Sequence, residues 1–125
     1  MMRSITLDTG ALIALERRGQ RITDVLRAAR SRRDRIVAPA PVITEWWRGR
    51  SDWRERILAA VNIEPIDDVL AMLAGEALSR VEGATAIDAI VMASAARRGD
   101  VVYTSDYPDL ERLRLVFPAV RVLSV

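Results

Sequence analysis

The stretch Arg3-Ser-Ile-Thr-Leu-Asp8-Thr-Gly-Ala-Leu-Ile-Ala-Leu15 joins a short apolar segment to one acid and then to a helical pattern. Residues 3–7 predict a strand, and the apolar spacing that follows predicts a helix over residues 9–17. Asp8 therefore falls at the carboxyl end of a strand. In an open parallel α/β sheet, ligands bind in the crevice outside those ends, so Asp8 is a candidate site residue.

The residue types that are missing limit the chemistry. The 125 residues contain no cysteine and no histidine, and all 19 basic residues are arginine. Disulfides, zinc–thiolate sites, histidine-activated nucleophiles and lysine-dependent phosphate sites are therefore excluded. A metal cofactor would need oxygen ligands, which suit Mg²⁺ or Mn²⁺.

Length and composition indicate one soluble domain over residues 1–125. Half of the residues are apolar, 29% are charged and the net charge is +2. No apolar stretch approaches the ~20 residues of a membrane span, so we expect a cytoplasmic protein without membrane contact. Residues 16–35 carry eight arginines against three acids. This basic region is either a solvated helix face or a phosphate-binding surface.

Strand and helix patterns alternate along the rest of the chain. Helices are expected over residues 20–33, 39–49, 51–61, 67–81 and 86–98 and after Pro108, and strands over residues 36–38, 62–65, 101–103 and 120–123. This alternation predicts a three-layer α/β/α fold with a central, mainly parallel sheet of about five strands.

Three further acids are placed to meet Asp8. Asp106 follows a strand, and Glu45 and Asp88 are expected in the first turns of their helices. At about 5 Å and an effective dielectric of 20, each pair of like charges costs about 3 kcal/mol, which a bound divalent cation would offset. We therefore expect phosphodiester hydrolysis by metal-activated water. Each acid also has a structural explanation: Asp88 forms a capping box with Thr85, Asp106 caps a helix, and Glu45 is a surface charge.

Four motifs resemble those of the PIN-domain ribonucleases, specifically the VapC toxins of bacterial VapBC toxin–antitoxin pairs. They are the opening Leu-Asp8-Thr-Gly-Ala-Leu, then Ile43-Thr-Glu45-Trp-Trp, then Ala86-Ile-Asp88-Ala, and finally Val102-Tyr-Thr-Ser-Asp106-Tyr-Pro-Asp109-Leu. The four acids are separated by 37, 43 and 18 residues, which suits a compact member of the family.

The resemblance implies a Mg²⁺- or Mn²⁺-dependent endoribonuclease that cleaves structured RNA, such as tRNA or ribosomal RNA, and so inhibits translation. It also implies a homodimer, or a hetero-oligomer with a cognate VapB-type antitoxin. Five acids match functional positions of the family: the quartet Asp8, Glu45, Asp88 and Asp106, and the additional acid Asp109. Thr104 or Ser105 would orient Asp106 or a bound water.

Two alternatives stay open at the level of sequence. One is a PIN nuclease that serves RNA processing without an antitoxin. The other is a non-catalytic, arginine-rich RNA-binding domain whose acids are caps and surface charges. The tryptophans Trp46, Trp47 and Trp53 are expected either to pack in the core or to contact an antitoxin.

Overall fold

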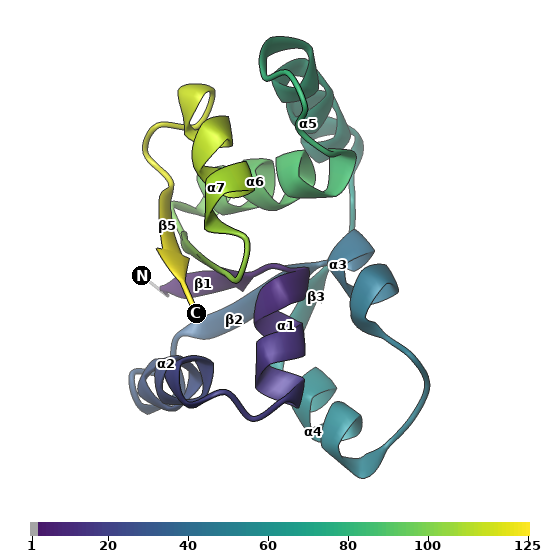
Figure 1. Cartoon of the computed structure of the whole chain (residues 1–125), viewed down its shortest axis with the longest axis vertical. Coiled ribbons are helices and arrows are strands. Elements are labelled where there is room, and N and C mark those ends of the chain that lie inside the picture. The colour runs from purple at the N-terminus through teal and green to yellow at the C-terminus, as the bar shows by residue number, and fades with distance from the viewer. Residues whose placement is uncertain (1–2) are drawn as a thin grey trace.

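The computed structural model describes residues 3–125, and strands and helices alternate in it as the sequence predicts (Figure 1). The strands are β1 (Ser4–Leu7), β2 (Arg35–Pro39), β3 (Asn62–Glu64), β4 (Val101–Thr104) and β5 (Arg121–Ser124). The helices are α1 (Thr9–Glu16), α2 (Gln20–Ser31), α3 (Ala40–Trp46), α4 (Asp52–Ala60), α5 (Asp68–Arg80), α6 (Ala86–Arg98) and α7 (Tyr107–Arg112), followed by a 3₁₀ turn over Leu113–Leu115. None of the helices in this described part is long and apolar enough to cross a membrane.

Within residues 3–125 the five strands form one parallel sheet in the order β3-β2-β1-β4-β5. The central strand β1 pairs with β2 on one side and β4 on the other, so that Ile5 lies opposite both Ile36 and Val101. Strand order therefore reverses at β1. In such sheets ligands bind beyond the carboxyl end of the strand where the order reverses. Here that strand is β1, and Asp8 is the residue that follows it.

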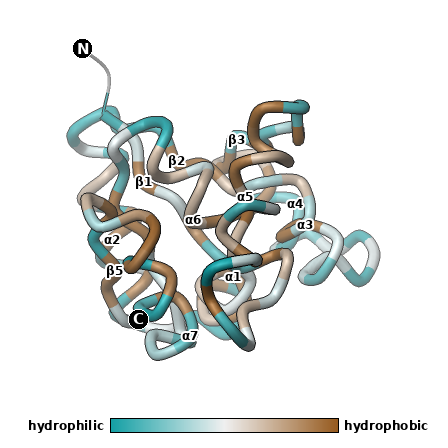
Figure 2. The backbone as a smooth tube through the Cα atoms, turned by 90° about the horizontal axis from the view of Figure 1, so that it is seen from above, coloured by the Kyte–Doolittle hydropathy of each residue, from teal (hydrophilic) through white to brown (hydrophobic). Residues whose placement is uncertain are grey.

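Helices cover both faces of the sheet, which confirms the predicted three-layer architecture. The helices α6 and α7 lie on one face, and α1 and α2 lie on the other (Figure 1). The side chains of Leu7 and Val102 are fully buried because the central strands are covered on both sides. Hydrophobic stretches accordingly run through the middle of the molecule, and most outer turns are hydrophilic (Figure 2).

Local signals in the sequence mark where most helices begin and end. The side chains of Ser51, Asp67 and Thr85 each accept a backbone N–H in the first turn of α4, α5 and α6. Gly99 follows α6 in the left-handed conformation, with φ of 73°, which glycine adopts without steric cost. The predicted helix over residues 86–98 is thereby confirmed at both ends.

The predicted helix over residues 39–49 was too long. It ends at Trp46, because Trp47 adopts extended backbone angles (φ −67°, ψ 129°). Trp46 is buried in the core, and Gly49, with φ of 103°, turns the loop that follows the helix. As a consequence Glu45 lies in the last turn of α3 and not in its first turn, as expected from the sequence.

The helix α5 buries one stripe of apolar side chains and leaves others exposed. The helix packs against α6 through Leu70, Ala74 and Ala77, which are spaced to lie on one stripe. Val69 points away from that stripe and is 56% exposed. The nearby apolar residues Ile63, Ile66 and Met72 are exposed as well.

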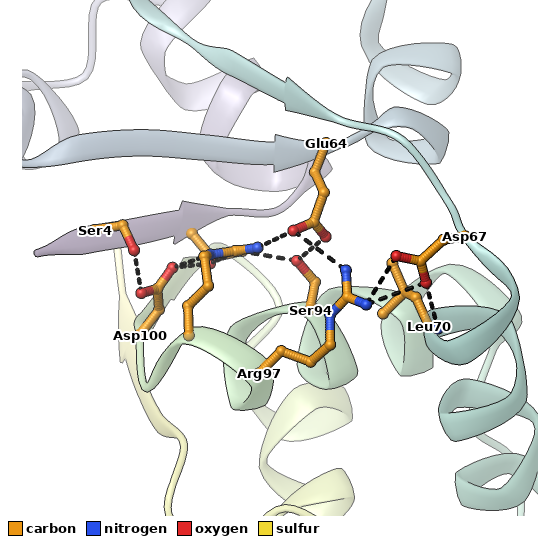
Figure 3. Close-up of polar contacts among 9 residues, drawn as sticks. Ser4, Glu64, Asp67, Leu70, Ser94, Arg97 and Asp100 are labelled. Atoms are coloured by element: carbon orange, nitrogen blue, oxygen red, sulfur yellow. Dashed lines mark hydrogen bonds and ion pairs between the residues drawn. The ribbon is translucent and has the colours of Figure 1, made fainter. Parts of the chain in front are cut away.

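A buried polar network ties α6 to the sheet (Figure 3). Asp100, which is 3% exposed, accepts hydrogen bonds from the hydroxyls of Ser4 and Thr6, the latter at 2.8 Å. The Arg98 guanidinium donates to Asp100 and Thr6, each at 2.8 Å, and to Glu64. Since a buried charge is tolerated only when it is paired and hydrogen-bonded, this network fixes the end of α6 against β1 and β3.

Candidate metal centre

Asp8 lies directly after β1, is the N-cap of α1, and is only 5% exposed. One carboxylate oxygen accepts the Ala11 backbone N–H at 2.8 Å, and the other accepts the Thr104 hydroxyl. The pKa of Asp8 rises from 3.8 to about 6, mainly because the side chain is buried. The two hydrogen bonds lower this pKa, and the charges of Asp88 and Asp106 raise it. Ionised Asp8 is therefore costly in the absence of a cation.

Thr104, at the end of β4, connects two of the acids. Its hydroxyl donates to Asp8 and accepts the backbone N–H of Asp106 at 2.7 Å. These residues meet because β4 lies beside β1, with Tyr103 opposite Leu7. Asp106 occupies the N-cap position of α7, yet within the described chain its carboxylate accepts no capping hydrogen bond. Helix capping therefore does not account for this acid.

Asp88 brings α6 into the same crevice. It lies in the first turn, as predicted, and its backbone N–H donates to the Thr85 hydroxyl at 3.2 Å. The cap is thus supplied by Thr85, and the Asp88 carboxylate faces other acids. One oxygen each from Asp88, Asp106 and Asp109 lies within 4.8 Å of the others.

Two acids of this trio, Asp88 and Asp106, have raised pKa values. Burial is the main cause that raises the pKa of Asp88, and the charges of Asp109 and Glu45 add to it. The pKa of Asp106 is raised first by a hydrogen bond shared with Asp109, and then by burial. The Arg112 guanidinium donates to Asp109 at 3.0 Å and lowers the pKa of both Asp88 and Asp106. One arginine thus offsets part of the negative charge.

Glu45 reaches the crevice from α3. Its carboxylate accepts the Thr9 hydroxyl at 2.5 Å and carries enough negative charge near Asp88 to raise the pKa of that acid. The side chain is exposed, and it does not belong to the group whose oxygens lie within 4.8 Å. Glu45 therefore lies at the rim of the acidic cluster.

These carboxylates fit a hard divalent cation. The donors in the tight trio are all oxygens, their spacing allows one ion to contact each of them, and ionisation of Asp88 and Asp106 is opposed by their neighbours. Mg²⁺ and Mn²⁺ prefer such ligands. A cation here would be held by Asp88, Asp106 and Asp109, with Asp8 beside them.

All four acids of the predicted quartet lie around one crevice, but the tightest group contains Asp109 in place of Asp8 and Glu45. Sequence reasoning missed the role of Thr9, which holds Glu45 through its hydroxyl. The sequence did offer a signal for this role, since Thr9 directly follows Asp8 and its hydroxyl, in the first turn of α1, lies near the same acids.

The tryptophans have separate roles. Trp46 is 3% exposed and packs edge-on against Trp47, with ring centroids 5.8 Å apart, which confirms the core-packing expectation for Trp46. Trp53 donates its indole N–H to the Glu16 carbonyl at 3.0 Å and lies under the Arg18 guanidinium. It borders a groove that is described below.

Solved structures with this fold cover nearly the whole chain at low sequence identity. VapBC2 from Rickettsia felis, bound to a DNA fragment from its promoter, aligns with a TM-score of 0.77 and 12% identity over 97% of this chain and 98% of that chain. DNA-bound VapBC from Salmonella typhimurium aligns with a TM-score of 0.73 and 20% identity over 98% of both chains. FitAB bound to the IR36 DNA fragment aligns with a TM-score of 0.69 and 19% identity over 96% of this chain and 94% of that chain.

Similarity at the level of sequence families agrees with the fold. No curated protein matches the chain. The family model described as "PIN domain" matches residues 5–114, a range that contains every acid of the crevice. The chain therefore belongs to the PIN-domain family of nucleases.

Proposed function

We propose that this protein is a Mg²⁺- or Mn²⁺-dependent endoribonuclease and the toxin of a toxin–antitoxin pair. The observation that carries the nuclease assignment is the meeting of Asp88, Asp106 and Asp109 oxygens within 4.8 Å, with buried Asp8 beside them. Carboxylates at these distances repel one another and do not stabilise the fold. A bound divalent cation would offset this repulsion and so accounts for the cluster.

The proposed mechanism assigns a task to each group of the site. Asp88, Asp106 and Asp109 would hold the cation, which when bound lowers the pKa of water and offsets charge on the reacting phosphate. Asp8 adds a further carboxylate whose orientation is set by the Thr104 hydroxyl. Glu45, exposed at the rim, is placed to accept a proton or to orient water.

Chemistry without a cation is a poor alternative for this chain. No histidine or lysine is present to deprotonate a ribose 2′-hydroxyl. We therefore propose that water attacks phosphorus, which leaves 5′-phosphate and 3′-hydroxyl ends. Products with a 2′,3′-cyclic phosphate would contradict this mechanism.

The test is cleavage of a structured RNA, tRNA or ribosomal RNA, by the purified protein. The wild type should cleave with Mn²⁺ or Mg²⁺ and not with EDTA, and Asp106→Asn should be inactive. Asp68→Asn, which changes an exposed acid of α5, should cleave like the wild type. If RNA is bound equally well in EDTA and is never cut, the protein is instead a non-catalytic RNA-binding domain.

The toxin assignment rests on the full-length likeness to the VapBC and FitAB chains. We propose that an antitoxin segment docks in a groove between α2 and α4, of about 590 Å³. Its floor includes Leu15, Leu26 and Ile57, and Arg27, Arg30 and Arg56 line it as well. Such a groove is complementary to an acidic amphipathic segment.

Expression tests separate a toxin from a PIN nuclease of RNA processing. A toxin should stop growth and translation when induced alone, and an adjacent gene for a small antitoxin should relieve this. Sequencing RNA 5′ ends after a brief induction identifies the target. Light scattering of the chain with and without the antitoxin determines whether it is a homodimer or a hetero-oligomer.

A further inference from the structure

Gly10 lies where the first turn of α1 meets the loop between β4 and α7. A Cβ atom added to Gly10 would lie 1.9 Å from the Ser105 Oγ, 3.0 Å from the Ser105 Cβ and 3.2 Å from the Ser105 backbone nitrogen. Ordinary contacts between such atoms are about 3.5–4.0 Å. The absence of a side chain at Gly10 therefore allows the two segments to approach each other.

Rotation of the Ser105 side chain would relieve only the first of these overlaps. The positions of the Ser105 Cβ and nitrogen are set by the backbone, so the backbone itself has to move by a few tenths of an ångström. Thr104, the residue before, resists movement because it is buried and its carbonyl accepts the Val125 N–H at 2.8 Å. The displacement therefore passes to the exposed residue that follows, Asp106, and strains the 2.7 Å hydrogen bond from its backbone N–H to the Thr104 hydroxyl.

We infer that Gly10 is a positioning residue for the metal centre, and that it acts through Ser105 on the Asp106 carboxylate. This inference rests on the proposed function, because it assigns the cation to the cluster of Asp88, Asp106 and Asp109. Groups that orient metal ligands without touching the metal typically change its affinity by about 10–100-fold when they are altered. A side chain at Gly10 should act in the same way.

The substitution Gly10→Ala separates positioning from folding. Alanine is a better helix former than glycine, so α1 itself should not be weakened. We expect Gly10→Ala to bind Mn²⁺ about tenfold more weakly than the wild type, as measured by electron paramagnetic resonance, and still to unfold cooperatively in EDTA, as measured by circular dichroism. Gly75→Ala is the matched control, because Gly75 also lies within a helix and a Cβ there has no neighbour within 4 Å.

A compensating change tests the route through Ser105. Ser105→Gly removes the Oγ and Cβ atoms, so Gly10→Ala combined with Ser105→Gly should bind Mn²⁺ as Ser105→Gly alone does. The metal-free ¹H–¹⁵N resonance of Asp106 should move in Gly10→Ala, stay in place in Gly75→Ala, and in the double variant match Ser105→Gly.

Several results would overturn the inference. One is a Gly10→Ala variant that binds Mn²⁺ as tightly as the wild type. Another is a Gly75→Ala variant whose Mn²⁺ affinity falls as much as that of Gly10→Ala. A third is a double variant that binds Mn²⁺ as weakly as Gly10→Ala. If the wild type binds no Mn²⁺, the metal centre itself is refuted, and an unmoved Asp106 resonance in Gly10→Ala would then reject the contact as well.

Discussion

The substitution Asp8→Asn should stabilise the metal-free protein at neutral pH. Asp8 is 5% exposed, and its pKa rises from 3.8 to about 6, mainly through burial. A pKa difference of about 2 units corresponds to about 3 kcal/mol of free energy of unfolding. Asparagine keeps an oxygen for the Ala11 N–H and is as good an N-cap as aspartate. Its amide nitrogen cannot accept the Thr104 hydroxyl, so about 3 kcal/mol is the upper limit of the gain.

The pH dependence follows from the direction of the shift. Because the pKa is higher in the folded protein than in the unfolded chain, the contribution of Asp8 to stability is fully present below pH 3.8. It is lost as the pH rises through about 6. Asp8→Asn and the wild type should therefore unfold at similar temperatures at pH 4. At pH 7.5 in EDTA the variant should melt at a higher temperature, by up to about 10 °C at roughly 3–4 °C per kcal/mol.

The assay is thermal unfolding followed by circular dichroism at both pH values, with Asp68→Asn as the control. Mn²⁺ at about 100 times its dissociation constant should add about 2.7 kcal/mol to the wild type at pH 7.5. A variant that is less stable than the wild type at pH 7.5, or a gap of equal size at pH 4, would refute the account of Asp8 as a buried, repelled carboxylate.

Three further predictions concern other parts of the fold. Arg98→Met should cost about 3–5 kcal/mol in urea denaturation, because it leaves buried Asp100 without its cation and leaves Glu64 only the more distant Arg97, at 3.7 Å. Arg97→Met should cost about 1 kcal/mol or less, and equal costs would contradict the role of the buried network. Thr104→Val should weaken Mn²⁺ binding by about 10–100-fold, whereas Thr104→Ser, which keeps the hydroxyl, should bind Mn²⁺ like the wild type. Wild-type Mn²⁺ affinity in Thr104→Val would show that the hydroxyl does not contribute to the site. Gly99→Ala, at φ of 73°, should lower stability by about 1–2 kcal/mol while Gly75→Ala leaves it unchanged or raises it; a harmless Gly99→Ala would be inconsistent with the left-handed turn after α6.

Elements with local signals were predicted well from the sequence. The helix α6 matches residues 86–98 because Thr85 and Gly99 act on their nearest neighbours. The strands β1 and β4 were also predicted from local signals, because each is a short apolar run followed by an acid one or two residues later. Their adjacency, which brings Asp8 near Asp106, depends on strand order and was only a hypothesis until the sheet was seen.

Contacts between distant residues could not be predicted in this way. The end of α3 depends on burial of Trp46 in the core, and the exposure of Val69 depends on which helix packs on α5. Asp100 appeared in the sequence only as a residue before a strand. Its partners in the network lie on β1 and α6, and no spacing in the sequence marks them.

The central claim is that carboxylates from α6, the loop after β4 and the first turn of α7 hold one divalent cation, with Asp8, which follows β1, beside them. Anomalous diffraction from crystals soaked in Mn²⁺ tests it directly. We expect a peak at the crevice with carboxylate oxygens of Asp88 and Asp106 at about 2.0–2.2 Å, the distance typical of such ions. Fully occupied Mn²⁺ elsewhere on the molecule, with none at this crevice, would contradict the claim.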